Sequence, residues 1–250
     1  MEEYITMKSK IKSEVSNYLL LMRNVPVLVM ILFVTSVILM NLLANKEVGL
    51  NLSWLALDCG VTISWLSFLC MDMLTKRFGT KASIQLSLTA MVINLFVCLM
   101  LFLISKVPGN WGMYYNYETS IVNDALNGTI GGTWYVVLGS AIAFASSAIV
   151  NAVLNTAIGK MFKKNNFTAY ATRSYVSTLL AQFVDNFIFA LVVSHTFFGW
   201  SMLQCVTCSL TGCIVELLWE VIFSPLGYKV CKQWERDNVG NTYINHQSNR

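Results

Sequence analysis

Residues 82–105 read ASIQLSLTAMVINLFVCLMLFLIS, a stretch of 24 residues that contains no charged side chain. An α-helix needs about 20 consecutive, mainly apolar residues to cross the hydrocarbon core of a bilayer. This stretch therefore predicts a membrane-spanning helix. It decides the class of the fold, because a helix of this kind must be surrounded by lipid or by other helices.

The composition of the whole chain agrees with a protein that is embedded in lipid. Hydrophobic residues make up 56% of its 250 residues, and charged residues make up 12%, about half the charged share of a typical soluble domain. Mean hydropathy is +0.58. These values exclude a disordered chain, a coiled coil and a water-soluble enzyme of ordinary surface. The net charge of +4 is mild, so no nucleic-acid partner is expected.

Five more stretches predict spanning helices, so we expect an all-α, polytopic membrane protein with six transmembrane helices. The additional stretches are 24–45, 54–74, 133–158, 175–197 and 200–226, and Pro225 is expected to end the last one. The chain then divides into a cytoplasmic N-terminal segment (1–23), a six-helix transmembrane domain (24–228) and a cytoplasmic tail (229–250). The connection 106–132 is rich in Gly, Asn and aromatic residues, which favours an outer interfacial loop; a lid over an entrance is the alternative.

The distribution of Lys and Arg predicts the orientation in the membrane. Fifteen of the 17 lie in the N-terminal segment, in the connections after the second and fourth helices, and in the C-terminal tail, whereas Lys46 and Lys106 lie on the other side. Cytoplasmic loops carry an excess of positive charge, so both termini are expected in the cytoplasm. We therefore expect a multi-pass membrane protein, and the resemblance described below implies the inner membrane of bacteria.

Acidic residues inside the predicted helices are the main functional signal, because a charge within a span is costly unless it is satisfied. Asp185 lies about 18 Å beyond Arg173 at 1.5 Å per residue, and Glu216 is also deep in its helix. The few cations lie near the predicted membrane ends and cannot neutralise these carboxylates at depth. A water-filled cavity or proton-binding carboxylates should therefore exist, which favours a transporter or channel over a structural scaffold.

Polar residues recur at helical spacing, which predicts stripes that face a shared interior. The stripes are Asp58, Thr62, Trp65 and Asp72; Ser140, Phe144, Ser147, Asn151 and Asn155; Ser177, Ala181 and Asp185, with the adjacent line Thr178, Gln182, Asn186 and Phe189; and Glu216 with Glu220. Carboxylates and amides can hydrogen-bond the edge of a flat, guanine-like ring, and aromatic side chains can stack on its face. The same groups suit an amine or a cation, and small polar residues can also bond helices to each other.

Signals for catalysis, metals and cofactors are weak. His195 is the only histidine in the predicted membrane region, and neither H-E-x-x-H nor G-x-S-x-G occurs. Cys205 and Cys208 form a C-x-x-C without a second half, which favours small apolar core residues over a metal or redox site. We expect no enzymatic activity, no metal and no cofactor.

Four short sequences, in order along residues 30–232, resemble motifs of the queuosine precursor transporter family, also called vitamin-uptake-transporter-like. They are 71–79 (MDMLTKRFG), similar to the signature Asp-x-x-(Thr/Val)-x-x-(Tyr/Phe)-Gly that closes the second helix; Ala44-Asn45-Lys46; Arg173 with Ser177, Gln182, Asp185 and Phe189; and Glu220 with Pro225 and Tyr228. The resemblance implies import of 7-cyano- or 7-aminomethyl-7-deazaguanine, or of queuine, by a facilitator or a proton-coupled carrier. It carries over Asp72, Arg173, Ser177, Gln182, Asp185 and Glu220 as functional positions.

The resemblance and the polar stripes together give the candidate residues. Substrate-binding candidates are Asp185, Gln182, Asn186, Glu216, Glu220, Asn151, Phe189 and Trp65; gating or structural polar candidates are Asp72, Arg173, Asp58, Asn45 and Ser177. The chain departs from residues common in the family at Lys76, Ala148, Asn151 and Glu216. Because Glu216 stands where the family often has Lys, a cationic aminomethyl base would suit the extra carboxylate.

Two other importers remain as alternatives. The first is the substrate-binding subunit of an ATP-driven vitamin importer, which also has six helices and docks through small residues spaced by three on its first helix. Here residues 25–44 read VPVLVMILFVTSVILMNLLA, which is bulky throughout. The second is an importer of another small, nitrogen-rich heterocycle. In each case the expected partners are a small-molecule substrate and the lipid bilayer, and a homo-oligomer is left open.

Overall fold

The computed structural model describes residues 2–112, 120–159 and 167–248, and all regular secondary structure in these ranges is helical. The elements are α1 (Glu2–Asn24), α2 (Val27–Leu43), α3 (Val61–Phe78), α4 (Thr80–Ser105), α5 (Ser120–Gly132), α6 (Trp134–Gly159), α7 (Phe167–Phe189), the π-helix η2 (Ala190–His195), α8 (Thr196–Phe198), α9 (Met202–Arg236) and α10 (Asn241–Ser248). An isolated antiparallel bridge joins Glu47 to Asp58. The predicted all-α class is confirmed.

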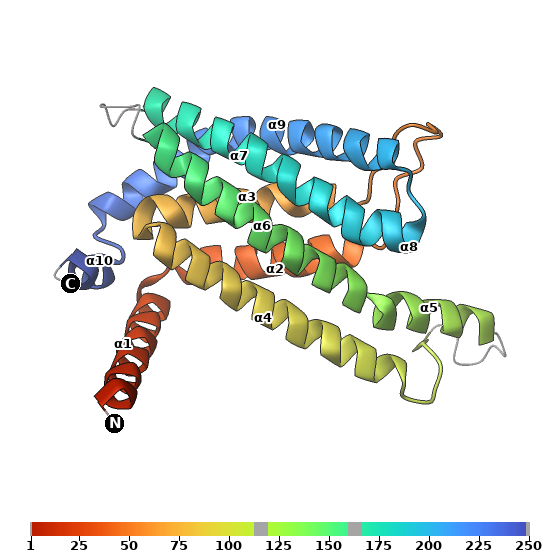
Figure 1. Ribbon diagram of the computed structural model, residues 1–250, viewed down its shortest axis with the longest axis horizontal. Helices are drawn as coiled ribbons and strands as arrows, with labels where there is room; N and C mark the ends of the chain where they lie inside the picture. Colours follow the sequence, from red (N-terminus) through yellow and green to blue (C-terminus); the bar gives the residue numbers. More distant parts are fainter. Residues whose placement is uncertain (1, 113–119, 160–166, 249–250) are drawn as a thin grey trace.

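The long helices form a closed ring. Each of α2, α3, α9, α7, α6 and α4 packs against the next, and α4 packs back against α2. Figure 1 shows these helices running along the long axis of the molecule, with α1, α10 and both termini at one end and α5 and α8 at the other. The junction between α3 and α4 lies at the same end as the termini, with Lys76 and Arg77 in the last turn of α3 and Lys81 at the start of α4.

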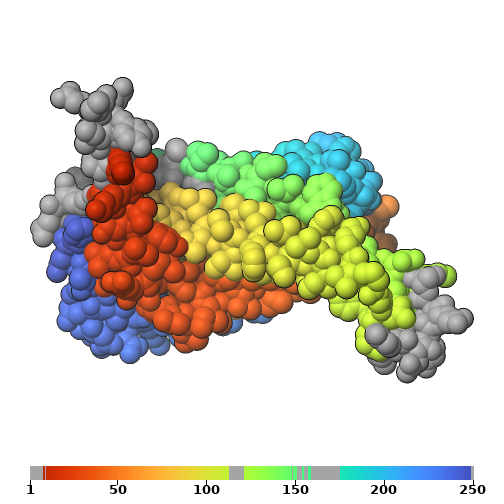
Figure 2. Space-filling view, turned by 90° about the horizontal axis from the view of Figure 1, so that it is seen from below, coloured from red at the N-terminus to blue at the C-terminus, as the bar shows by residue number. Residues whose placement is uncertain are grey.

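The outer surface of the ring is apolar, as expected for a surface in contact with lipid. On α4, the exposed side chains Leu88, Val92, Phe96, Leu99 and Leu103 recur every three or four residues and so form one stripe. In Figure 2, α4 (yellow) lies between α2 (orange) and α6 (green), so this stripe has no helix in front of it in that view. Small and polar residues of α4, such as Ala82 and Asn94, are buried on its other side.

Length and hydropathy identify four to five apolar segments that could cross a membrane. They are Thr80–Ser105, Ile121–Ser147, Tyr175–Phe198 and Met202–Arg236, with the bent pair Lys10–Asn24 and Val27–Leu43 as a fifth. The expected count of six also includes α3, which has Asp72, Lys76 and Arg77 within its 18 residues. Because of these three charges, α3 is not among the apolar segments that length and hydropathy identify, and the predicted count of six spans stays a prediction.

The second expected helix begins later than predicted. Residues 54–60 precede α3. Contrary to the prediction, Asp58 therefore does not share a helical face with Thr62, Trp65 and Asp72. The Asp58 carboxylate instead accepts a hydrogen bond from the backbone N–H of Gly60, at 2.7 Å. Acidic side chains favour this place, because the first N–H groups of a helix lack intrahelical partners.

The last helix does not end at Pro225, contrary to the prediction. α9 continues to Arg236 with Pro225 inside it. A proline lacks the N–H that would bond to the carbonyl four residues earlier, here that of Val221. The hydroxyl of Ser224 donates to this carbonyl oxygen at 3.4 Å, so part of the missing bond is replaced and the helix can continue.

Part of the connection expected to be a loop is helical. Residues 120–132 form α5, whereas residues 113–119, with three of its aromatic residues, lie outside the described ranges. The indole of Trp111 donates to Asn127 at 3.0 Å, and the backbone N–H of Trp111 donates to Asn123 at 2.7 Å. These bonds hold the segment before α5 against the helix.

Candidate functional site

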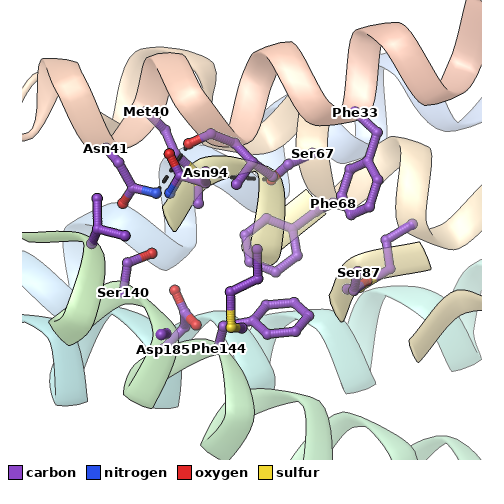
Figure 3. A pocket seen from close by; sticks show the side chains of 15 residues that line it. Phe33, Met40, Asn41, Ser67, Phe68, Ser87, Asn94, Ser140, Phe144 and Asp185 are labelled. Atoms are coloured by element: carbon purple, nitrogen blue, oxygen red, sulfur yellow. Dashed lines mark hydrogen bonds between the residues drawn. The ribbon is translucent and has the colours of Figure 1, made fainter. Parts of the chain in front are cut away.

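The interior of the ring contains a cavity whose lining is mainly polar on one side and mixed on the other. Figure 3 shows Asn41, Asn94 and Ser140 on the same side as Asp185, with Phe144 next to Asp185, and Phe33 and Phe68 on the other side with Ser67 and Ser87. The empty space between its walls is about 540 Å³, which includes open solvent. The centres of water molecules can occupy about 40 Å³ of this space. It therefore has room for a few water molecules in this conformation, and a ring-sized ligand requires small movements of the side chains.

A second chamber adjoins the first and contains three carboxylates. Asp58, Asp185 and Glu216 all line it, together with Asn186 and Phe189. The two chambers share the lining residues Met40, Asn41, Phe68, Ser140 and Asp185. Asp185 thus lies where the chambers meet, and we use "the cavity" for both.

Glu216 joins three helices. Its side chain, 1% exposed, accepts hydrogen bonds from the hydroxyl of Ser64 in α3 and from the amide of Asn186 in α7, the latter at 3.1 Å. Gly212, one turn earlier in α9, makes room for this arrangement, because a Cβ there would lie 2.9 Å from the amide nitrogen of Asn186. Both donors are neutral, so any charge on Glu216 has no direct cationic partner among the residues that the structure describes.

Asp185 is held from α6. One of its oxygens accepts a hydrogen bond from the hydroxyl of Ser147 at 2.8 Å. Ser140 and Phe144, on the same stripe of α6, line the cavity beside it. The prediction that Ser140, Phe144 and Ser147 share an interior stripe is confirmed at these three positions.

Asp58 enters the cavity from the connection between α2 and α3. Gly60 is required next to it, because a Cβ at Gly60 would lie 2.7 Å from both the Asp58 carboxylate and the carbonyl oxygen of Met40. Burial raises the pKa of Asp58 from 3.8 to about 6, although hydrogen bonds from the backbone of Gly60 and Val61 oppose the change. This carboxylate therefore accepts a proton in a mildly acidic solution.

Positive charge is absent from the cavity lining that the structure describes. Salt bridges within the described residues join Lys81 to Glu14 and Lys232 to Glu235, both on the exposed surface at the end with the termini. Three carboxylates close together without a cation repel one another when ionised. The arrangement suits a positively charged or proton-donating ligand, or protonation of the carboxylates themselves.

Between the cavity and the end of the molecule with the termini, polar residues of α7 and α9 lie in a closed interface, which we call the α7–α9 seam. It contains Thr178 and Gln182 of α7 and Glu220 and Ser224 of α9, all at most 3% exposed. Asn186 bonds Glu216 at one end of the seam, and Tyr175 bonds Ser224 at 2.6 Å at the other. Gln182 is completely buried, and neither its amide oxygen nor its nitrogen has a hydrogen-bond partner among the described residues.

The structure brings some of the expected site residues together and separates others. Asp185, Asn186, Glu216, Phe189 and Asp58 line the cavity, whereas Gln182 and Glu220 are in the seam. Ser177 is buried in α7, outside the cavity lining. The side chains of Asn151 and Arg173 lie outside the described residues, although their backbones belong to α6 and α7.

Three further candidates lie away from the cavity. Trp65 stacks on Phe223 and Trp219 of α9, with ring centroids 4.5 and 5.6 Å away, and is absent from the cavity lining. Asn45 bonds Thr133 and Tyr135, which fixes α2 to the start of α6. Asp72 lies in the second half of α3, one turn before Lys76.

Sequence reasoning missed several lining residues. Asn94 is buried within the strongly apolar α4, and Asn41 and Ser67 were outside the predicted polar stripes. A single polar residue in an otherwise apolar span was the available signal for Asn94. Phe68 and Met40 carried no signal, because apolar side chains in a span face lipid or the interior equally well.

No group of three or more His, Cys, Asp or Glu side chains that could hold a metal ion occurs among the described residues. Cys205 and Cys208 are both buried, and Cys208 lines the chamber that contains Glu216. The polar groups that the cavity lining offers to a ligand are therefore carboxylates, amides and hydroxyls, with the single thiol of Cys208 beside them.

Comparison with known proteins gives one match. Residues 58–230 match the family model described as "Putative vitamin uptake transporter". The matched range begins at Asp58 and ends within α9, and so includes most of the cavity and all of the seam. The chain matches no curated protein and no solved structure.

Proposed function

The chain belongs to the vitamin uptake transporter family, and from this premise we propose that it imports a queuosine precursor of the 7-deazaguanine type. The cargo that fits best is 7-aminomethyl-7-deazaguanine. The observation that carries the proposal is the cavity lined by Asp58, Asp185 and Glu216, with amides and aromatic rings beside them.

The geometry supports a flat, nitrogen-rich ring. The free edge of a guanine-type ring offers two parallel N–H donors, which match one carboxylate. Asp185 is the best-placed acceptor, because it lines both chambers, and Asn41 or Asn94 can bond the ring carbonyl. Phe68 and Phe144 provide faces against which the ring can pack.

Glu216 gives the reason for the aminomethyl form. It lies in the chamber that also contains Asp58, and the described lining includes no cation. A protonated aminomethyl group would supply the missing positive charge and gain a charge-assisted hydrogen bond. The 7-cyano form has no such charge and should bind more weakly.

The arrangement of the helices supports six spans with both termini in the cytoplasm. The six helices of the ring are the spans in this proposal, and α3 can cross despite its charges because Lys76 and Arg77 lie at its end. The basic turn between α3 and α4 lies at the same end as both termini, which agrees with the excess of positive charge on cytoplasmic loops. The membrane in question is the bacterial inner membrane.

Transport requires that the site opens alternately to the two sides. The cavity extends toward the connection that holds Asp58, whereas the seam closes the path toward the end with the termini. In our proposal, separation of α7 from α9 opens the seam, and Gln182 and Glu220 then contact the ligand on its way to the cytoplasm. Asp72 and Arg173 are proposed to border this inner exit, and protonation of a cavity carboxylate would couple import to the proton gradient.

The test uses bacterial cells that neither synthesise nor import queuosine precursors. They express the protein, receive 7-aminomethyl-7-deazaguanine in the medium, and are assayed for queuosine in tRNA. Restored queuosine in the wild type and its loss in Asp185→Asn support the proposal. Asp124→Asn is the matched control, because Asp124 is exposed on α5 and outside the cavity lining.

Both variants are checked for equal amounts of protein in the membrane. Full queuosine in Asp185→Asn would remove Asp185 from the site. Absence of queuosine with wild-type protein in the membrane would refute this substrate. Copurification of an ATP-hydrolysing coupling protein would instead support the alternative of an ATP-driven importer.

A further inference from the structure

α1 carries an apolar face that the rest of the chain leaves uncovered. Ile11, Val15, Leu19 and Met22 are spaced by four, four and three residues, and each is between 38% and 57% exposed. This spacing places them on one side of the helix. The residues precede the segment matched to the family, and nothing in the proposed transport reaction uses them.

The direction of α1 differs from that of the spans. It meets α2 at an angle of 103°, and the break lies at Val25 and Pro26. Figure 1 shows α1 leaving the bundle sideways, at the end where α10 lies. If the ring spans the bilayer, α1 therefore lies nearly parallel to the membrane surface.

Contacts on α1 show which side faces the bilayer. Tyr18 is on the same side as Val15 and Met22, and its hydroxyl is 2.8 Å from that of Thr89, more than two turns into α4. Asn17, on a different side, contacts His246 of α10 at 2.9 Å. The side with the apolar stripe therefore turns toward the membrane-exposed part of α4, and the side with Asn17 turns toward the C-terminal helix.

Basic residues flank the apolar stripe. Lys8, Lys12 and Arg23 are all exposed, and Lys81 at the start of α4 lies close by, bonded to Glu14. A helix with an apolar face and basic residues beside it is suited to the boundary between acyl chains and headgroups. Each basic group near an anionic surface contributes about fivefold in affinity.

We propose that α1 is an in-plane membrane helix that inserts its apolar stripe among the lipids and binds anionic phospholipid headgroups through Lys8, Lys12 and Arg23. The partner is the lipid surface beside the bundle. The proposal requires that the ring spans the bilayer, but it is independent of the substrate. It can therefore fail while import of the 7-deazaguanine base holds, and the reverse is equally true.

The test places a fluorescent label on α1 of the full-length protein in vesicles. Val15→Cys and Ser16→Cys are matched, because adjacent helical residues point about 100° apart and both positions are exposed. The background carries Cys59→Ser, since Cys59 is half-buried and the other six cysteines are buried. Spin-labelled phospholipids serve as the quencher, and the vesicles contain phosphatidylcholine with or without phosphatidylglycerol.

We expect lipid quenching at position 15 to exceed that at position 16 by about twofold or more, and phosphatidylglycerol to increase it. In the triple variant Lys8→Gln, Lys12→Gln, Arg23→Gln the increase should disappear, whereas quenching of position 15 by neutral lipid remains. Equal quenching at positions 15 and 16 overturns the in-plane orientation. Shielding from water at position 15 without quenching by lipid also overturns it, because a second protein chain would then cover the stripe.

Discussion

The cavity and the α7–α9 seam both contain polar residues of α7 and α9, but these residues differ in their hydrogen bonding and in their access to open space. In the cavity, Glu216 and Asp185 each accept hydrogen bonds from neutral side chains and remain next to open space. In the seam, Gln182 is completely enclosed and has no hydrogen-bond partner among the described residues. The cavity is thus prepared for a ligand, whereas the seam holds a polar group at a cost in stability.

In the proposed mechanism, this difference lets α7 and α9 serve both binding and gating. A buried polar group that lacks a hydrogen bond costs about 1–3 kcal/mol, so the closed seam is less stable than an apolar interface would be. Such an interface separates more easily than the satisfied part around Glu216. We infer that the polar seam keeps the closed and open states close in free energy.

The largest expected effect is at Glu216. Glu216→Gln removes the charge but preserves the shape, so we expect uptake of the aminomethyl base to fall at least about tenfold, as for the loss of a charge-assisted hydrogen bond. Uptake is measured as queuosine in tRNA at low external substrate concentration.

The control for Glu216→Gln is Glu235→Gln, which changes an exposed carboxylate at the end of α9. This variant should import at the wild-type rate. Equal uptake by Glu216→Gln and wild type would mean that the cavity charge plays no part in recognition.

A second, smaller effect concerns pH. The pKa of Asp58 is about 6 in the folded protein and 3.8 without burial, so folding favours its protonated form. The stability from this group is fully present below about pH 4 and is lost as pH rises through about 6. Because the side chain is partly exposed and water screens its charge, we expect the free energy of unfolding to change by only about 2 kcal/mol. Thermal unfolding in detergent between these pH values measures it.

Asp58→Asn serves as the comparison for this pH dependence. An amide keeps the side chain neutral at every pH, so the decrease in unfolding temperature between pH 4 and pH 6 should become smaller. An unchanged pH dependence in Asp58→Asn would assign the effect to other groups.

The sequence predicts the helices better than their rotation about their own axes. The stretch without charges at 82–105 matches α4, and the polar spacing along α6 correctly selects Ser140, Phe144 and Ser147 as interior. Both signals depend on one helix alone. Trp65 follows the same spacing rule and yet stacks on Trp219 and Phe223 of α9, because its place depends on a neighbour that is distant in sequence.

Local chemistry explains the two helix boundaries that were predicted wrongly. Asp58 and Gly60 form a turn before α3 in which the carboxylate bonds the backbone, and hydropathy does not register such a turn. Pro225 usually marks a helix end, but the hydroxyl of Ser224 bonds the carbonyl that proline leaves without its partner. Both are short-range effects of one side chain, and neither changes the hydrophobic pattern.

A third prediction concerns the space beside Asn186. In Gly212→Ala the new Cβ would lie 2.9 Å from the amide nitrogen of Asn186, so this side chain must move away from Glu216. We expect a loss of about 2 kcal/mol in stability from overpacking, together with reduced uptake. Gly49→Ala is the matched control, since no atom lies within 4 Å of a Cβ at that position. Equal unfolding temperatures of the two variants would show that Asn186 moves without cost.

The smallest expected effect tests the seam directly. Gln182→Met keeps the length of the side chain but removes the two polar atoms that lack partners among the described residues, so the closed protein should gain about 1 kcal/mol in stability. Because the gain applies only while α7 and α9 are in contact, opening becomes harder and uptake should fall although the unfolding temperature rises. Gln233→Met, on the exposed surface near the end of α9, should change neither quantity. A rise in stability with unchanged uptake would mean that the seam stays closed during transport, and the inner exit would then have to lie elsewhere in the ring.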